Sequence, residues 1–579
     1  MTTSESIKVS TTESNSPSAI LPPASPHEAL DHILLHKFHG GIHPPENKIS
    51  ADNIKIHKVC IETHLPQRLH IPLTTPDGSA LLSLVKAGDR VLKGQALTED
   101  ETGRFPPQHA PTSCEVISIE QIPDQHPSAI AEPMLVLKPD GKDEWQPRRP
   151  STLDDILTAD KYDNIQKIFQ AGIIGMGGAG FPTATKIKSA LSLPAHKKLH
   201  TLLINGAECE PYISCDDGLM QNQPQAILHG ALIIAKCLNV SKIQIVIEDN
   251  KPEAIKALRT ARNQLDVAIA IIEIPTRYPS GGEKQLIEIV SGRQVPVAQF
   301  PASIGFSVQN VATTVAVFEA LVEDKPLISR LVTVTGEKVA TPGNYCVPIG
   351  MPIEDLLVQA GVDFEQIHQI IMGGPMMGSN INDGRIPVSK TTNCLIVPSV
   401  SELPPPPPAS PCIRCGLCTE VCPASLLPQQ LYWHSKSEAW EKAEALNLFD
   451  CIECGACSWV CPSHLPLVDY YRYAKDSLKA KKLQQQQIEQ ARIRHEKKLA
   501  RLAKQEQEKA ARRLQRAEEA KRRKLQREQQ DGLTDEIKKQ SVADAVARVK
   551  ARKASRETLA ETEHQQHSTN NVQDKNGGV

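Results

Sequence analysis

The sequence predicts a multidomain α/β protein that also carries β-rich and cysteine-rich modules and ends in a long charged helix. Three observations support this. A chain of 579 residues is too long for one hydrophobic core. Strand-like and helix-like apolar segments alternate in its middle, which is typical of a mostly parallel sheet. Eight of the 15 cysteines lie in two short runs, and the chain beyond residue 475 is mostly Lys, Arg, Glu, Gln and Ala.

The N-terminal part begins with residues 1–36, which we expect to be disordered, because they are Ser/Thr-rich and lack the apolar core of a secretory signal. Residues 37–150 then show short β runs separated by turns, such as LLSLVKAGDRVLKGQALT and PMLVLKP. They predict a β-sandwich resembling the barrel-sandwich hybrid of biotinyl and lipoyl carriers. No lysine lies between Gly94 and Val116, so we expect a structural or docking domain and not a swinging arm.

The middle of the chain holds two further domains. Residues 151–327 contain the strand-like segments LHTLLINGAE and IQIVIED and the helix-like segments AILHGALIIAKCL and QNVATTVAVFEALV, which predict the parallel α/β domain. Residues 328–402 return to β and turn signals, with LVTVTGEKV and YCVPIG. The five prolines 404–408 predict a stiff, extended linker into a cysteine module at residues 403–475.

The charged tail is predicted to be helical over residues 476–560 and disordered over residues 561–579. Residues 481–560 hold 24 Lys+Arg and 12 Asp+Glu, a net charge of +12, so the rest of the chain carries −14 to give the total of −2. The apolar residues keep no heptad register, and the lack of aromatics argues against nucleic-acid binding. A solvated single helix and a helix that contacts anionic lipid headgroups both remain open. No segment has 18 consecutive apolar residues, so we expect no membrane-spanning helix.

The cysteine runs PCIRCGLCTEVCP and CIECGACSWVCP both have the spacing C-x2-C-x2-C-x3-C-P, which is the bacterial ferredoxin signature. Three thiolates of each run bind one [4Fe-4S] cluster, while the fourth binds the neighbouring cluster. The first predicted ligand set is Cys412, Cys415, Cys418 and Cys461, and the second is Cys451, Cys454, Cys457 and Cys422. A structural zinc site is the alternative, but it needs only four thiolates, whereas the two runs supply eight.

The seven other cysteines are scattered. We expect five of them to be small buried residues, namely Cys60, Cys114, Cys237, Cys346 and Cys394. Cys209 and Cys215 flank a polar loop, where a further role remains open.

A glycine-rich loop reads IIGMGGAGFPTATK, from Ile173 to Lys186. Its glycines leave backbone amides open to an anion, and the helix predicted from Pro182 directs its N-terminus toward the same place. These glycines are Gly175, Gly177, Gly178 and Gly180. The spacing is not the strict dinucleotide fingerprint. Taken alone, the loop is therefore either a ligand site or a tight structural turn.

Several segments together resemble the flavin- and NADH-binding subunit of respiratory complex I and its diaphorase relatives. GMGGAGFPTATK is similar to GRGGAGFPTGLK, and NGAECEP to NADEGEP. YPSGGEKQL and VQNVATT are similar to YICGEETAL and VNNVET, in the same order along the chain. With the β-sandwich and the double ferredoxin module added, the layout over residues 37–475 resembles the C-subunit family of the Rnf (Rsx) electron-transport complex.

The resemblance implies a Rossmann-like domain that binds FMN and NADH, followed by a β-grasp module of the SLBB type. The residues implied to bind FMN and NADH are the four loop glycines with Lys186, Asn205, Glu208, Glu210, Gly281, Glu283 and Asn310. This sequence departs from the motif at Met176, Ala207, Gly282 and Gln309. Fewer charged groups at these places could alter nucleotide binding.

The function implied by the resemblance is electron input from NADH, through FMN, to the two [4Fe-4S] clusters. The implied partners are integral membrane subunits and a second ferredoxin-like subunit, which couple electron flow to ion movement. The implied location is peripheral, on the cytoplasmic side of a bacterial inner membrane. No residue is predicted to be catalytic, because the redox chemistry belongs to the cofactors. The alternatives are a wiring and docking subunit with a vestigial flavin site, or a soluble diaphorase acting alone.

Overall fold

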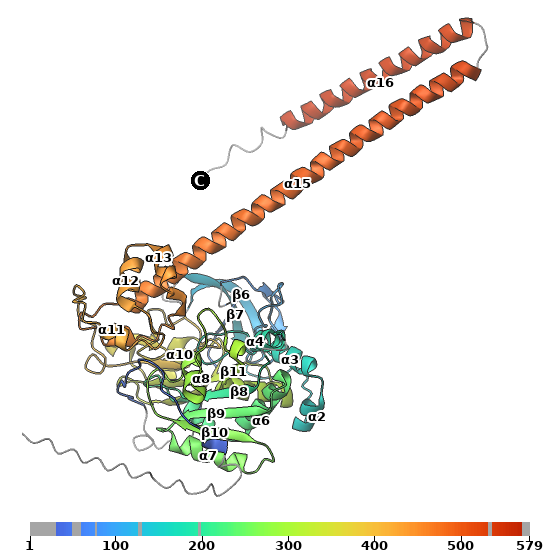
Figure 1. The fold of residues 1–579 in the computed structure, drawn as a ribbon. Helices are drawn as coiled ribbons and strands as arrows, with labels where there is room; N and C mark the ends of the chain where they lie inside the picture. Colours follow the sequence, from blue (N-terminus) through green and yellow to red (C-terminus); the bar gives the residue numbers. More distant parts are fainter. Residues whose placement is uncertain are drawn as a thin grey trace, which may run out of the picture. The chain divides into compact units, whose positions relative to one another are not determined.

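The computed structural model describes residues 30–48, 60–75, 78–124, 130–194, 198–530 and 535–569 (Figure 1). The chain divides into two compact units, Met1–Leu478 and Lys479–Val579, and each is described by itself. Residues 1–29 of the expected disordered lead lie outside the described residues.

Residues 30–36 belong to the same expected lead, but they contact the α/β domain. The guanidinium of Arg262 donates to the carboxylate of Asp31 at 2.5 Å, and both side chains are almost fully buried. The same carboxylate accepts the backbone N–H of Ile271 at 2.8 Å. Residues 30–36 are therefore ordered, although the sequence suggested disorder. The buried guanidinium of Arg262 needs the carboxylate of Asp31 as its partner, because an unpaired buried charge is strongly destabilising.

The N-terminal domain is the predicted β-sandwich. Its main sheet is antiparallel, in the order β2-β7-β6-β4, and comprises β2 (Leu69–Pro72), β4 (Arg90–Val91), β6 (Cys114–Pro123) and β7 (Ala131–Pro139). A second, two-stranded sheet pairs β3 (Leu82–Ser83) with β5 (Thr98–Glu99). Buried and exposed residues alternate at the start of β6, as expected of a strand with one face on the core.

The α/β domain is built on a parallel sheet in the order β10-β9-β8-β11. Its strands are β8 (Thr201–Gly206), β9 (Lys242–Glu248), β10 (Ile269–Ile274) and β11 (Phe306–Asn310). Its helices are α2 (Leu153–Thr158), α3 (Lys161–Gln170), α4 (Thr183–Leu191), α5 (Cys215–Asn222), α6 (Pro224–Leu238), α7 (Pro252–Arg262), α8 (Glu283–Ser291), η2 (Pro301–Ile304) and α9 (Val311–Val322). Alternate residues of the strands enter two separate hydrophobic cores, so both faces of the sheet are covered.

The β-grasp module forms a six-stranded mixed sheet in the order β1-β13-β12-β16-β14-β15. It comprises β12 (Ser329–Thr335), β13 (Gly343–Pro348), α10 (Ile353–Gln359), η3 (Phe364–Gln366), β14 (Ile370–Met372), β15 (Ser379–Ile381) and β16 (Cys394–Ile396). Its edge strand β1 (Ile61–Glu62) comes from the N-terminal segment ahead of the sandwich. The sandwich and the β-grasp sheet share one hydrophobic core, which includes Leu69, Leu137, Val332 and Val347.

The cysteine module consists of short helices around two similar loops. Its elements are α11 (Leu417–Glu420), α12 (Pro428–Lys436), α13 (Trp440–Ala445), η4 (Leu448–Asp450) and α14 (Ala456–Trp459). The start of α15 (Leu467–Gln530) closes its core with Leu467, Val468 and Tyr471. Gly416 and Gly455 adopt φ angles of 85° and 77° just before α11 and α14, a conformation that favours glycine.

The charged tail contains the remainder of α15 and α16 (Asp535–Thr569). The predicted long charged helix is thus confirmed. The helix α16 extends into residues 561–569, for which the sequence predicts disorder, because Glu, Gln and Ala favour helix even without packing. Among the described residues, no helix is both long and apolar enough to cross a bilayer.

Candidate functional site

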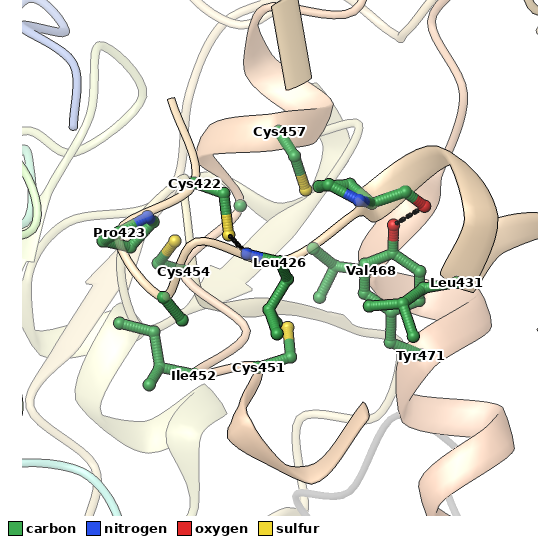
Figure 2. A pocket seen from close by; sticks show the side chains of 13 residues that line it. Cys422, Pro423, Leu426, Leu431, Cys451, Ile452, Cys454, Cys457, Val468 and Tyr471 are labelled. Atoms are coloured by element: carbon green, nitrogen blue, oxygen red, sulfur yellow. Dashed lines mark hydrogen bonds between the residues drawn. The ribbon is translucent and has the colours of Figure 1, made fainter. Parts of the chain in front are cut away.

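One pocket brings together the four cysteines of the second predicted set. Cys422, Cys451, Cys454 and Cys457 line it, and their sulfurs are drawn in Figure 2. Apolar side chains complete the wall, among them Leu426, Leu431, Ile452, Val468 and Tyr471. Cys422 comes from the first run and the other three from the second. The tertiary fold therefore brings Cys422 of the first run beside three cysteines of the second.

The surroundings of these thiols suit a bound cluster. The backbone N–H of Leu426 donates to Cys422 Sγ and that of Glu453 donates to Cys451 Sγ, both at 3.4 Å (Figure 2 shows the first). Such N–H donors stabilise the negative charge of cluster sulfurs. Burial raises the pKa of Cys454 to about 12, so its free thiol is neutral near pH 7. A bound iron ion lowers that pKa and displaces the proton.

The first predicted set lies beside the second and is more open to solvent. Cys412 Sγ accepts the N–H of Arg414 at 3.4 Å. Cys412, Cys418 and Cys461 pack against the hydrophobic cluster that contains Cys422 and Cys457, which places the two sets next to each other. Cys415 is exposed, whereas Cys422, Cys454 and Cys457 are buried.

The glycine-rich loop lies at the topological switch point of the parallel sheet. The chain adds β9 and β10 on one side of β8 and then returns to add β11 on the other side, so the order of strands reverses between β8 and β11. Ligands of such sheets bind at the carboxyl ends of those two strands. A Cβ atom on Gly177 would come within 3.2 Å of Asn310, the last residue of β11. One on Gly178 would meet nothing within 4 Å, but its φ of 131° disfavours other residues. The loop therefore offers a bare backbone surface beside Asn310.

Lys186 connects the glycine-rich loop to the segment that carries Glu283 and to strand β11. Its ammonium donates to Glu283 Oε1 at 2.6 Å and to the carbonyl of Val308 at 2.7 Å. Lys186 lies in the first turn of α4, which begins at Thr183 directly after the loop, and Glu283 is the first residue of α8. Gly175 and Gly180 lie at the two ends of the same loop, where Gly175 N–H donates to Phe181 O at 2.8 Å.

The two predicted asparagines are fixed by hydrogen bonds. Asn205 Nδ2 donates to the carbonyl of Gly281 at 2.9 Å. Asn310 caps α9 by accepting the N–H of Ala312, and its Nδ2 donates to Asp216 Oδ2 at 2.6 Å. Asp216 was not predicted, and no pattern in the sequence pointed to it. Burial, followed by the nearby carboxylate of Glu208, raises the pKa of Asp216 to about 7.

The two predicted glutamates are engaged by backbone amides. Glu208 accepts the N–H groups of Asp216 and Asp217 at the start of α5, at 2.7 and 3.1 Å. Glu210 Oε1 accepts those of Met376 and Met377, at 2.8 and 3.0 Å. Both residues are implied by the resemblance to bind FMN and NADH. In this structure their carboxylates hold the Asn205–Pro211 loop to neighbouring elements.

The segment that carries Gly281 and Glu283 also contacts the cysteine module. Tyr278 donates its hydroxyl to the carbonyl of Cys454 at 2.6 Å, and Gln285 Nε2 donates to that of Pro423 at 3.1 Å. Lys284 pairs with Asp450 at 3.0 Å. Tyr278 opens the YPSGGEKQL motif, but nothing in the motif itself assigns that residue a role. The cysteine set that adjoins the switch point is therefore the more buried one, and we call it the buried cysteine set: Cys422, Cys451, Cys454 and Cys457.

Together, a parallel α/β domain with a glycine-rich loop at its switch point and two adjoining four-cysteine sets define a class of protein, the flavin- and iron–sulfur-dependent electron carriers. Four family models match the chain in agreement with this class. They are the RnfC barrel sandwich hybrid domain at residues 36–142, the Nuo51 FMN-binding domain at 168–319, the SLBB domain at 331–379 and the 4Fe-4S dicluster domain at 408–465.

Three of the most similar curated relatives are each named as the C subunit of an ion-translocating oxidoreductase complex. The chain is 46% identical to that of Haemophilus influenzae (strain 86-028NP) over 474 residues, which are 82% of this chain and 69% of the relative. It is 47% identical to that of Serratia proteamaculans (strain 568), covering 81% and 65% of the two chains. It is 45% identical to that of Yersinia pestis bv. Antiqua (strain Antiqua), and the match covers 82% of this chain and 75% of the relative. The chain belongs to this C-subunit family, which confirms the resemblance.

Solved structures of an NAD+-reducing [NiFe]-hydrogenase are more distant. The air-oxidized form is 20% identical with a TM-score of 0.41, and the match covers 53% of this chain and 64% of that chain. The H2-reduced form is 22% identical with a TM-score of 0.42, and the match covers 56% of this chain and 63% of that chain.

Proposed function

We propose that the chain is the electron-input subunit of a membrane-bound ion-translocating complex. It passes electrons between NADH and two [4Fe-4S] clusters by way of FMN. The observation that carries this proposal is the contact between Tyr278 and Cys454, which joins the segment bearing Gly281 and Glu283 to the buried cysteine set. Electron transfer requires cofactors held at short, fixed distances, and this contact fixes the two modules against each other.

The proposed flavin site lies at the switch point. The amides of Gly177, Gly178 and Gly180 and the N-terminus of α4 suit a phosphate group, Gly175 closes the loop by donating to Phe181 O, and Lys186 adds a positive charge. Asn205, Glu208, Glu210, Gly281, Glu283 and Asn310 complete the proposed site, the two glutamates by holding its loop. A flavin bound here links a two-electron donor to one-electron acceptors.

The proposed clusters have an order. Cys422, Cys451, Cys454 and Cys457 hold the one next to the flavin site, because this set adjoins the Tyr278–Gln285 segment. Cys412, Cys415, Cys418 and Cys461 hold the second. Cys415 is exposed and its neighbour Ile413 is 68% exposed, so this side suits transfer to a partner.

The proposed partners are the integral membrane subunits of the complex and its ferredoxin-like subunit. The family membership supports a peripheral position on the cytoplasmic face of a bacterial inner membrane. The net charge of +12 over residues 481–560 supports contact of the tail with anionic lipid headgroups, each basic residue contributing about 1 kcal/mol near such a surface.

The test uses the full chain with its clusters reconstituted under anaerobic conditions. Added FMN should lose its fluorescence on binding, and NADH should then bleach the cluster absorbance. Parallel titration with NADPH measures nucleotide preference. Intact clusters with no FMN binding would reject the proposed flavin site and favour the wiring subunit with a vestigial site. NADH-driven reduction that is unaffected by membrane subunits, together with failure to bind them, would favour a soluble diaphorase.

A further inference from the structure

Three potential metal ligands outside the two cysteine runs meet at the edge of the β-grasp sheet. Cys60 Sγ, Cys346 Sγ and a carboxylate oxygen of Glu62 all lie within 4.8 Å of one another. Cys60 Sγ is 3.9 Å from Glu62 Oε1. Both cysteines are half-buried and Glu62 is exposed, so the group is accessible. The expectation that these two cysteines are buried is therefore wrong, whereas it is confirmed for Cys114, Cys237 and Cys394.

The strand register explains why the three side chains meet. Glu62 of β1 is the parallel partner of Cys346 of β13. Paired residues of neighbouring strands point to the same face of a sheet. Cys60 precedes Glu62 by two residues, and side chains two apart share a face. The backbone thus directs two thiols and a carboxylate to one side of the sheet.

The spacing of the ligand atoms suits a metal ion. The two sulfurs and the Glu62 oxygen lie within 4.8 Å of one another, and a tetrahedral zinc ion with Zn–S bonds of about 2.3 Å holds two sulfurs about 3.8 Å apart. A disulfide would use the two thiols alone, whereas a metal ion also uses the Glu62 carboxylate.

We propose that Cys60, Glu62 and Cys346 bind one zinc ion, with water as the fourth ligand. Binding breaks two S–H bonds, displaces all but one of the water ligands of the hydrated ion, forms two Zn–S bonds and a Zn–O bond to Glu62, and releases two protons to solvent. Two further charged groups act on Cys346, namely Lys325 and Glu319. They pair with each other at 2.6 Å and so add no net charge.

The ion would fasten the N-terminal segment to the β-grasp sheet. Among the residues that the structure describes, only two pairs, Ile61 with Tyr345 and Glu62 with Cys346, join β1 to β13. A strand this short contributes little by itself, and a metal that binds both strands stabilises the native state by mass action. This role is independent of the flavin and cluster chemistry.

The test measures zinc and iron in the full chain with both clusters loaded, after incubation with zinc sulfate and removal of the excess. We expect one zinc per chain in the wild type and none in Cys60→Ala or Cys346→Ala, with unchanged iron. The matched control is Cys237→Ala, a buried cysteine on α6 that should keep the zinc. Glu62→Gln should weaken zinc binding by more than the roughly 10- to 100-fold that loss of an outer-shell partner costs.

Thermal unfolding supplies a second measurement that does not depend on the cysteine variants folding well. Zinc should raise the unfolding midpoint of the wild type, and chelation should reverse this, while the exposed substitution Glu62→Gln should abolish the shift. Zinc that remains in Glu62→Gln with wild-type affinity, or a wild type that binds none, would overturn the proposal. Recovery of a Cys60–Cys346 disulfide from anaerobically purified protein would overturn it as well.

Discussion

The hydroxyl of Tyr278 donates a 2.6 Å hydrogen bond to the backbone carbonyl of Cys454, and both residues are buried. Tyr278 belongs to the α/β domain and Cys454 to the cysteine module. The bond therefore connects the segment that carries Gly281 and Glu283 directly to the buried cysteine set.

Replacing Tyr278 by Phe should loosen this connection. The change leaves the carbonyl of Cys454 buried without its donor, which costs about 1–3 kcal/mol. We expect a lower midpoint of thermal unfolding and slower NADH-driven reduction of the clusters. Tyr473→Phe is the control, because Tyr473 is 52% exposed and its hydroxyl donates to the exposed carboxylate of Glu438 at 3.2 Å. Equal effects of the two substitutions would contradict a specific role for Tyr278.

The two cysteine sets should behave differently when each is broken. Cys454→Ser and Cys415→Ser should each reduce the iron content from eight to about four per chain, since each [4Fe-4S] cluster has four thiolate ligands. Cys454→Ser should also prevent NADH from reducing the remaining cluster. Cys415→Ser should leave that reduction intact but slow transfer to an external acceptor. Electron paramagnetic resonance after addition of NADH distinguishes the two, and the reverse pattern would invert the proposed order.

Lys186→Met should weaken FMN binding. It removes a charge-assisted hydrogen-bond donor, worth about 1.5–3 kcal/mol, so the dissociation constant should rise about 10- to 150-fold. Fluorescence titration with FMN measures this. Lys188→Met, on the same helix, is the control, because Lys188 lies over the ring of Phe169 on the other side of α4 from the loop contacts of Lys186. Unchanged FMN affinity in Lys186→Met would exclude the residue from the site.

Lys390 should make stability depend on pH. Burial lowers its pKa to about 7, and its amine donates to the carbonyls of Pro107 and Gly172 at 2.9 and 2.7 Å. Between pH 7 and about 10.4 the unfolded chain binds more protons at this lysine than the folded chain does. The contribution of neutral, buried Lys390 to the free energy of unfolding is therefore greatest above about pH 10.4, and it decreases as the pH falls toward 7.

The measurement compares the wild type with Lys390→Met from pH 7 to 9. The difference in unfolding free energy should grow in favour of the wild type by up to about 1.4 kcal/mol per pH unit. The nearby His109 does not interfere, because burial lowers its pKa to about 3 and it stays neutral throughout. A difference that does not change with pH would show that Lys390 is charged in the folded protein.

The sequence by itself determined which thiols are the candidate cluster ligands, because three of the four in each set lie at a fixed spacing within one short run. It also predicted the parallel sheet and the glycine-rich loop, since apolar periodicity and backbone freedom are properties of contiguous residues. It did not predict that β1 joins the β-grasp sheet or that Asp31 is buried against Arg262.

Tertiary structure alone decided which cysteine set adjoins the switch point, how Glu208 and Glu210 are used, and that Cys60 meets Cys346. Each of these depends on pairing between residues far apart in the chain. No pattern within a segment records such pairing, because it is set by the packing of whole domains around shared cores.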